Sequence, residues 1–308
     1  MKGSSKELTL EGTFPVLPTP FTTVGEFDVN SFEQVIDYAL SCGVDGIVFP
    51  GLASEYEQLT QAERLSMCAV VGARVNGQVP FVMGASAATP ELAIKYSVAG
   101  ALAGASCAMV MAPNKFADDL EGMIAFFNTL AESVDIPIML QNAPKPMGAG
   151  LPIEQVREIV LAVPKIRYVK EETMPCGQRI EQLLADRPEN LIGVFGGAGG
   201  RYIIDELNRG SLGTFPAIEL TELHVQLVKA HRSGAVGLAR ELFASMLPIL
   251  NMQAVYRCSL TKEVLRRRGI VATNSVRAPG PVMDDADYKE LKEFWCLVEP
   301  RMGPLEVG

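Results

Sequence analysis

The stretch CAMVMAPNKFADDLEGMIAFFNTLAESVDIPIMLQNAP at residues 107–144 shows the unit from which the chain is built. It opens with a short apolar run, Cys107–Pro113, passes through an amphipathic segment, Leu120–Val134, and closes with a second apolar run, Ile136–Pro144. Short apolar runs bounded by turn residues are typical of strands buried on both faces of a parallel sheet. An amphipathic segment between two such runs predicts a helix that covers the sheet.

The same unit recurs along the chain. Further apolar runs occupy residues 12–18, 45–51, 79–86, 166–173, 191–197 and 211–217. Helical patterns occupy residues 30–41, 60–75, 89–103, 120–134, 153–162, 177–186, 200–209 and 219–232. Eight strand–helix units predict an α/β fold of the (β/α)8 TIM-barrel type, which takes roughly 250 residues. A doubly wound sheet is the alternative, and the even spacing without a break favours the barrel.

The pattern changes after the eighth unit. Residues 235–253, 256–268 and 285–298 read as helices with no apolar run between them. We therefore expect a barrel over residues 1–233 and a C-terminal extension of three helices over residues 234–308.

Composition narrows the class of protein. The 308 residues carry 27 basic and 36 acidic side chains, a net charge of −9, with 48% hydrophobic and 20% charged residues. This apolar content excludes a disordered chain, and the acidic balance argues against a nucleic-acid partner. No run approaches the ~20 apolar residues of a membrane span, and the first ten residues lack the apolar segment of a signal peptide. We expect a cytoplasmic protein with no membrane partner.

Cysteine and histidine give no sign of a metal site. The six cysteines are scattered singly, so we expect free thiols and no zinc motif. The two histidines, His224 and His231, have no third ligand nearby in the sequence, and neither lies near a nucleophile turn. We expect no metal and no histidine-dependent hydrolase.

The sixth run, IRYVKEET at residues 166–173, carries the clearest chemical signal. Alternation along a strand puts Tyr168, Lys170 and Glu172 on one face and Val169 and Glu171 on the other. Active sites of barrels lie at the carboxyl ends of the strands. A lysine buried there is favoured as the neutral amine, which can attack a ketone and form a Schiff base. The alternative is a lysine that reaches the rim and pairs with a neighbouring glutamate.

Three turns at other strand ends supply candidate binding groups. The turn Gly51–Glu55 can present backbone N–H groups to a carboxylate. Gln141 and Asn142 place amides at the end of the fifth strand, and Gly197 lies in a glycine-rich turn that lets backbone approach a substrate. That turn lacks the G-x-G-x-x-G spacing of a dinucleotide site. Ordinary strand–helix turns are the alternative for each.

Several of these residues together resemble a known family. Pro18-Thr19-Pro20-Phe21, the glycine turn ending in Glu55, Asn142-x-Pro144 and Val169-Lys170 occur in the order and spacing of the dihydrodipicolinate synthase / N-acetylneuraminate lyase family. The resemblance covers roughly residues 10–300. It implies a TIM barrel with three extra helices, a homotetramer, and no metal or organic cofactor. It also implies that Lys170 condenses with a 2-keto acid whose carboxylate is held by backbone amides around Leu52 and Ala53.

The chain departs from the usual family pattern at two places. The family turn Gly-x-Thr-Gly-Glu is Gly51-Leu52-Ala53-Ser54-Glu55 here, and the family's acid/base tyrosine is Gln141. Ser54-Glu55, Gln141-x-Ala143-Pro144 and Lys170-x-Glu172-Thr173 are instead similar to a dehydratase subgroup that acts on 2-keto-3-deoxy sugar acids, of the L-2-keto-3-deoxyarabonate dehydratase type. This resemblance implies that the catalytic residues are Lys170, Glu172 and Gln141. The residues implied to bind substrate are Leu52, Ala53, Ser54, Glu55, Asn142 and Gly197.

The predicted function is the dehydration of a 2-keto-3-deoxy sugar acid through a lysine Schiff base. Two alternatives stay open: a class I aldolase that cleaves or forms such an acid with pyruvate, and a keto-acid-binding protein without catalysis. Glutamine cannot shuttle a proton at neutral pH, so the proton carrier is expected to be a carboxylate. Glu172 fits that role if burial raises its pKa, and it could equally be a salt-bridge partner of Lys170.

Overall fold

The strands of the computed structural model, which describes residues 9–303, form a closed parallel barrel. They are β1 (Gly12–Thr13), β2 (Ile47–Phe49), β3 (Phe81–Gly84), β4 (Cys107–Met111), β5 (Ile138–Asn142), β6 (Ile166–Glu171), β7 (Gly193–Phe195) and β8 (Gly213–Thr214). Strands β2 to β7 pair in sequence order, and β1 pairs with β8. Parallel bridges from Val16 to Val48 and from Gly196 to Thr214 join the two groups, and a bridge from Val16 to Ala217 extends the β1–β8 pair. The predicted (β/α)8 fold is therefore confirmed.

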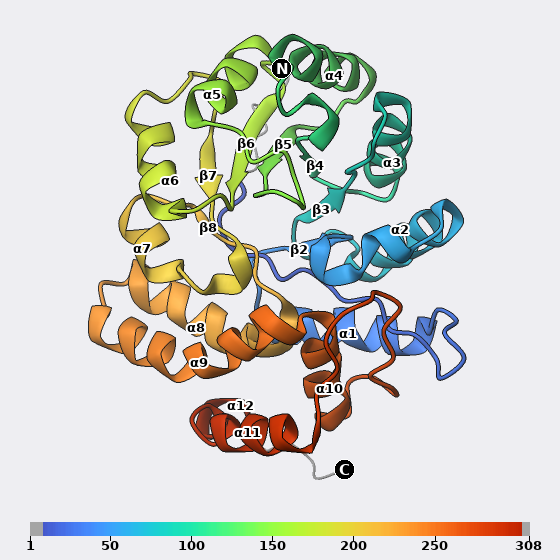
Figure 1. Cartoon of the computed structure of the whole chain (residues 1–308), viewed down its shortest axis with the longest axis vertical. Coiled ribbons are helices and arrows are strands. Elements are labelled where there is room, and N and C mark those ends of the chain that lie inside the picture. Colours follow the sequence, from blue (N-terminus) through green and yellow to red (C-terminus); the bar gives the residue numbers. More distant parts are fainter. Residues whose placement is uncertain (1–8, 304–308) are drawn as a thin grey trace, which may run out of the picture.

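Eight helices surround the strands (Figure 1). They are α1 (Val29–Ser41), α2 (Gln61–Val75), α3 (Pro90–Leu102), α4 (Leu120–Ser133), α5 (Ile153–Ala162), α6 (Cys176–Ala185), α7 (Ile203–Asn208) and α8 (Thr221–Arg232). Local signals set their starts: Thr60 and Glu63 form a capping box before α2, and Thr89 caps α3 ahead of Pro90. The predicted helix over residues 200–209 is wrong at its start. Gly199 and Gly200 have φ of 67° and 82°, so α7 begins only at Ile203.

The C-terminal extension consists of α9 (Val236–Tyr256), α10 (Cys258–Arg267), α11 (Asp285–Trp295) and the single turn α12 (Glu299–Met302), which the sequence patterns did not predict. In Figure 1 these helices lie along one edge of the barrel, beside α8. They share one apolar core with α7 and α8, which includes Leu223, Leu227, Leu250, Leu260 and Trp295. The burial of these apolar side chains stabilises the packing of the extension against α7 and α8.

The interior of the barrel is filled by side chains rather than open. Phe14, Phe195 and Phe215 pack together, with the rings of Phe14 and Phe215 stacked at 5.3 Å. Tyr168 packs against Phe195 and accepts a hydrogen bond from the backbone of Leu10 at 3.1 Å. This plug closes the lower barrel, so a cavity can form only above it, at the carboxyl ends of the strands.

Three smaller expectations concern residues within the described range 9–303. All six cysteines are free, as predicted. No group of three or more His, Cys, Asp or Glu side chains there is placed to hold a metal ion. No helix in this part of the chain is long and apolar enough to cross a membrane. The expectation about a signal segment concerns the first ten residues, of which residues 1–8 lie outside the described range.

Candidate active site

Lys170 and Glu172 meet at the top of the barrel. Lys170 lies near the end of β6 and Glu172 directly follows that strand, and Nζ of Lys170 lies 3.2 Å from Oε1 of Glu172. Lys170 is 4% exposed, and its ammonium lies 5.6 Å from the centre of the Phe215 ring at the top of the aromatic plug. The strand alternation therefore predicted the orientation of both side chains correctly.

Two groups besides Lys170 hold the Glu172 carboxylate. Gln141, inward on β5, donates from Nε2 to Oε2 at 2.6 Å, and the Ala198 N–H donates to Oε1 at 3.1 Å. Gly197 makes room for this arrangement, because a Cβ there would lie 2.4 Å from Oε1 of Glu172. The Gln141 amide thus positions the carboxylate, and the lack of a side chain at Gly197 leaves room for it.

These contacts decide the charge of Glu172. Burial by itself raises its pKa, but the positive charge of Lys170 and the hydrogen bonds from Gln141 and Ala198 outweigh burial, and the pKa is lowered. The condition considered from the sequence, a pKa raised by burial, is therefore not met, and Glu172 forms the ion pair with Lys170 that was the alternative. Glu172 is an ionised carboxylate in the resting protein, which suits a base rather than an acid.

The turn after β2 lines the same cavity. Leu52 and Ala53 line the cavity and begin a short 3-10 turn, η1 (Leu52–Ser54). No acceptor among the described residues takes the N–H groups of Leu52 and Ala53. Ser54 is buried and turned away: its hydroxyl donates to the Leu17 carbonyl and accepts from the Gly51 N–H. Ser54 therefore holds the turn in shape, while the two preceding N–H groups stay available for an anion.

Glu55 connects this turn to the C-terminal extension. Its buried carboxylate forms an ion pair with Lys262 of α10 and accepts hydrogen bonds from the N–H groups of Arg277 (2.7 Å) and Ala278 (2.6 Å). Burial lowers the pKa of Lys262, and the Glu55 charge opposes that effect. Glu55 lies along an outer groove rather than in the Lys170 cavity.

Replacing Lys262 by methionine is expected to lower the free energy of unfolding by about 3–5 kcal/mol, because it leaves a buried carboxylate without its counter-charge. Urea unfolding at neutral pH measures the change. The double variant Glu55→Gln, Lys262→Met removes both charges and is expected to lose less than the single variant. A single variant within about 1 kcal/mol of the parent would contradict the assigned role of the pair.

Asn142 lies on the other side of β5. Because Gln141 points inward, Asn142 points outward, where its amide donates to Glu171 (2.9 Å) and Leu151 (3.1 Å) and accepts from the Leu151 N–H. Glu171 also pairs with Arg179 at 3.3 Å. The structure therefore does not bring Asn142 to Lys170. Its contacts fasten the segment between β5 and α5 to the outside of the barrel.

The cavity around Lys170 has a volume of about 150 Å³. Besides Lys170, Glu172, Leu52 and Ala53, its lining includes Arg201, Gln253, Arg257 and Met147, which sequence reasoning missed. Arg201 directly follows the glycine turn after β7, and that position was the one signal available. Gln253 and Arg257 belong to the end of α9, where no motif marked them.

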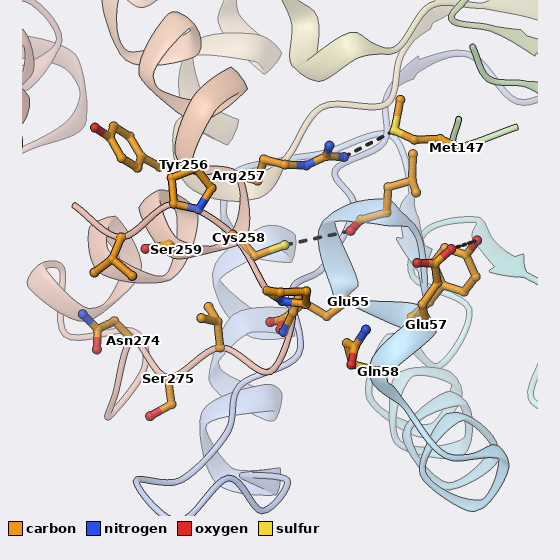
Figure 2. Close-up of a pocket in the computed structure, with 18 of the residues that line it drawn as sticks. Glu55, Glu57, Gln58, Met147, Tyr256, Arg257, Cys258, Ser259, Asn274 and Ser275 are labelled. Atoms are coloured by element: carbon orange, nitrogen blue, oxygen red, sulfur yellow. Dashed lines mark hydrogen bonds between the residues drawn. The ribbon is translucent and has the colours of Figure 1, made fainter. Parts of the chain in front are cut away.

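A larger groove of about 580 Å³ lies outside the cavity, and Figure 2 shows its lining. The two spaces share Leu52, Met147, Arg257 and Cys258. In Figure 2 the Arg257 side chain extends toward Met147, and Cys258 points at the turn after β2. Burial raises the pKa of the Cys258 thiol to about 11, so this cysteine is not a thiolate nucleophile at neutral pH.

Another buried carboxyl, that of Glu206, lies next to the glycine turn that follows β7. Glu206 of α7 accepts a hydrogen bond from the Cys176 thiol at 3.1 Å, and its Oε2 has no partner among the described residues. Burial, together with the negative charge of Glu172, raises the pKa of Glu206 to about 7. A Cβ at Gly196 would lie 1.9 Å from this carboxyl, so Gly196 and Gly197 separate the two glutamates.

This raised pKa predicts a pH-dependent loss of stability. A rise from 4.5 to about 7 corresponds to about 3 kcal/mol, present below pH 4.5 and lost as pH rises through 7, because the folded state holds the proton more tightly. Glu206→Gln mimics the protonated carboxyl. We expect it to match the parent near pH 5 and to be more stable at pH 8, by urea unfolding. Glu132→Gln on the outer side of α4 is the control, and equal pH dependence of Glu206→Gln and parent would refute the prediction.

The closed barrel, with a lysine–carboxylate pair above its aromatic plug, defines a protein of the TIM-barrel enzyme class. The profile of the dihydrodipicolinate synthetase family matches residues 9–295, and the chain belongs to this family. Members of this family are lyases and aldolases, and this membership supports a lyase activity for the chain.

Individual relatives fall within the same family. The chain is 25% identical to L-2-keto-3-deoxyarabonate dehydratase of Azospirillum brasilense over 94% of both chains. It is 27% identical to 4-hydroxy-tetrahydrodipicolinate synthase of Bacillus subtilis over 85% of this chain and 90% of that one. The crystal structure of dihydrodipicolinate synthase from Rhodopseudomonas palustris superposes with a TM-score of 0.85 at 24% identity, covering 94% of this chain and 99% of that chain.

Proposed function

We propose that this lyase dehydrates a 2-keto-3-deoxy sugar acid through a Schiff base on Lys170. The observation that carries the proposal is the pair of Lys170 and ionised Glu172, 3.2 Å apart in a cavity with no tyrosine among its lining residues, all of which lie in the described range. An enzyme that lacks a tyrosine proton relay needs another base, and Glu172 is the carboxylate in reach of the reacting carbons.

The free N–H groups of Leu52 and Ala53 supply the site for the substrate carboxylate. They lie on the wall of the same cavity as Lys170 and have no acceptor within the described part of the chain. A carboxylate held there would place the adjacent keto carbon toward the lysine. Two backbone donors create the positive potential locally, in a chain whose net charge is −9.

The reaction then follows from the positions of two side chains. The Lys170 amine attacks C2, and the loss of one water gives an iminium. Glu172 takes a proton from C3, and the electrons of that bond pass to the nitrogen as an enamine. The protonated Glu172 then gives the proton to the C4 hydroxyl, which leaves as water as the enamine electrons return and form the C3–C4 double bond. The iminium is the electron sink, so the proposed reaction uses no metal or organic cofactor. Hydrolysis of the unsaturated imine frees the lysine.

A class I aldolase is the second candidate. The 27% identity to the synthase of Bacillus subtilis is the observation that favours this second activity class. In retro-aldol cleavage the base removes the proton of the C4 hydroxyl instead of a C3 proton, and Glu172 is again the carboxylate in reach. The two reactions share the Schiff base and differ in the bond that breaks.

One experiment tests the shared step and then separates the candidates. The protein is incubated with pyruvate, reduced with borohydride and analysed by peptide mass spectrometry, and the label is expected on Lys170. Incubation with 2-keto-3-deoxyarabonate is then expected to give a 2,5-dioxo acid. Release of pyruvate with an aldehyde would instead identify an aldolase. Absence of any 2-keto-acid adduct on Lys170 would refute both.

A further inference from the structure

Two arginines line the Lys170 cavity. Arg201 follows the glycine turn η4 (Ala198–Gly200) after β7, and Arg257 lies at the junction of α9 and α10. The charges of Lys170 and Glu172 compensate each other in their ion pair. The two guanidinium groups therefore give the cavity a net positive charge.

Neutral atoms are the only polar partners of these two guanidinium groups within the described residues. Nη1 of Arg201 donates to Oε1 of Gln253 at 3.1 Å, and Nη2 of Arg257 donates to the Met147 sulfur at 3.5 Å. Arg201 is half-buried and Arg257 is exposed. Three half-buried arginines elsewhere have carboxylate partners: Arg277 pairs with Glu63, Arg268 with Glu222 and Arg179 with Glu171. Arg201 and Arg257 line one cavity and have no carboxylate partner among the described residues. Arginine at such a site is well suited to bind an anion.

The backbone is shaped around both side chains. Gly199 has φ of 67°, and a Cβ there would lie 3.0 Å from Nη1 of Arg201 and 3.2 Å from Oε1 of Gln253. Arg257 has φ of 48° and ψ of −123°, a conformation that is costly for a residue with a Cβ. This conformation ends α9 and directs the side chain across the mouth of the cavity toward Met147 (Figure 2).

A buried acid that is influenced by the Arg201 charge forms no ion pair with it. Glu219 lies in the short turn before α8, buried, with Thr261 donating to its Oε2 at 2.9 Å and no ion pair to Arg201. Burial raises the pKa of Glu219, and the Arg201 charge opposes this only in part. The positive charge of the cavity is therefore available to a ligand that enters it.

We infer that the substrate is a 2-keto acid with a second carboxylate at the end away from the keto carbon, and that Arg201 and Arg257 bind this second carboxylate. The inference rests on the proposed function, because Lys170 and the Leu52 and Ala53 N–H groups account for the keto carbon and the first carboxylate. A planar guanidinium matches a carboxylate with two parallel hydrogen bonds. A substrate with a neutral terminal hydroxyl, such as 2-keto-3-deoxyarabonate, would still react at Lys170 but would leave both charges uncompensated, and it is expected to bind more weakly.

Matched 2-keto acids test the inference through the Lys170 adduct. The probes are 2-oxoglutarate and 2-oxoadipate, each compared with the acid of equal length that lacks the second carboxylate, 2-oxopentanoate and 2-oxohexanoate. The readout is the concentration that gives half-maximal borohydride-trapped label on Lys170. At least one dicarboxylate is expected to label at a concentration about ten- to a hundredfold lower than its partner.

Two variants and one control locate the effect. Arg201→Gln and Arg257→Gln, made singly and together, are expected to remove most of the preference for the dicarboxylate over its monocarboxylate partner, while pyruvate, which has no second carboxylate, still labels Lys170. Arg240→Gln, an exposed position on α9 with the same change of charge, is expected to keep the preference.

The outcomes separate the two proposals. Labelling by pyruvate without any preference for a dicarboxylate, or a preference that survives in the double arginine variant, overturns the inference and leaves the proposed function standing. Loss of pyruvate labelling in the arginine variants also overturns it, because the arginines would then bind the first carboxylate. No label from any of the five acids refutes the proposed function and the inference together.

Discussion

Replacing Lys170 by methionine is expected to lower turnover of any 2-keto acid by about 10⁴-fold or more and to abolish the borohydride-trapped adduct. The reason is chemical: methionine fills a similar volume but has no amine to attack C2. Because Lys170→Met also leaves Glu172 without its ion pair, Lys170→Arg is measured as a second variant. It keeps a positive charge beside Glu172 and still cannot form the imine.

Both variants are measured by initial rates and by mass spectrometry of the reduced protein, after circular dichroism has shown that they fold. Lys95→Met, on an exposed position of α3, is the matched control and is expected to keep both rate and label. Turnover above about a tenth of the parent rate in Lys170→Arg, or an adduct on another lysine, would contradict the assignment of the nucleophile.

Replacing Glu172 by glutamine is expected to lower kcat by about 10²- to 10⁴-fold while Lys170 remains labelled. The amide keeps the shape of the side chain and can still accept from the Ala198 N–H, but it cannot take a proton from C3. Loss of proton transfer with retained adduct is the pattern that separates a base from a residue that only binds substrate.

The pH profile supplies a second readout for Glu172. Its pKa is held below the usual 4.5 by Lys170 and its hydrogen-bond donors despite burial, so the acid limb of kcat/KM that it causes should lie below pH 4.5. Glu132→Gln, on the outer side of α4, is the control and should leave rate and profile unchanged. A near-parental kcat in Glu172→Gln would show that another residue is the base.

Much of this site was readable from local sequence. Strand alternation alone put Tyr168, Lys170 and Glu172 on one face. In the structure Tyr168 is buried in the barrel interior, and Lys170 and Glu172 line the cavity above it. The same rule, applied to β5, would have separated Gln141 from Asn142, because neighbouring residues of a strand point to opposite sides. Asn142 was grouped with the substrate-binding residues on its position at a strand end, and its contacts lie on the outer face.

Other properties depend on contacts between distant parts of the chain. Glu172 stays ionised because Gln141 of β5 and the Ala198 N–H after β7 reach it, and no pattern around residue 172 shows either contact. The role of Glu55 depends in the same way on Lys262, 207 positions further along the chain. Burial alone would have given the opposite answer for the charge of Glu172.

The sequence by itself determined the barrel, the extension and the orientation of Lys170, because the periodicities of strands and helices are local and repeat eight times. Contacts in the folded chain decide which strand-end groups face the lysine, which glutamate keeps its charge, and that two arginines, one after η4 and one between α9 and α10, line one cavity. The physical reason is that electrostatic and hydrogen-bond energies depend on distances in space, and the extension brings Arg257 to a barrel strand that ends nearly 90 residues earlier in the chain.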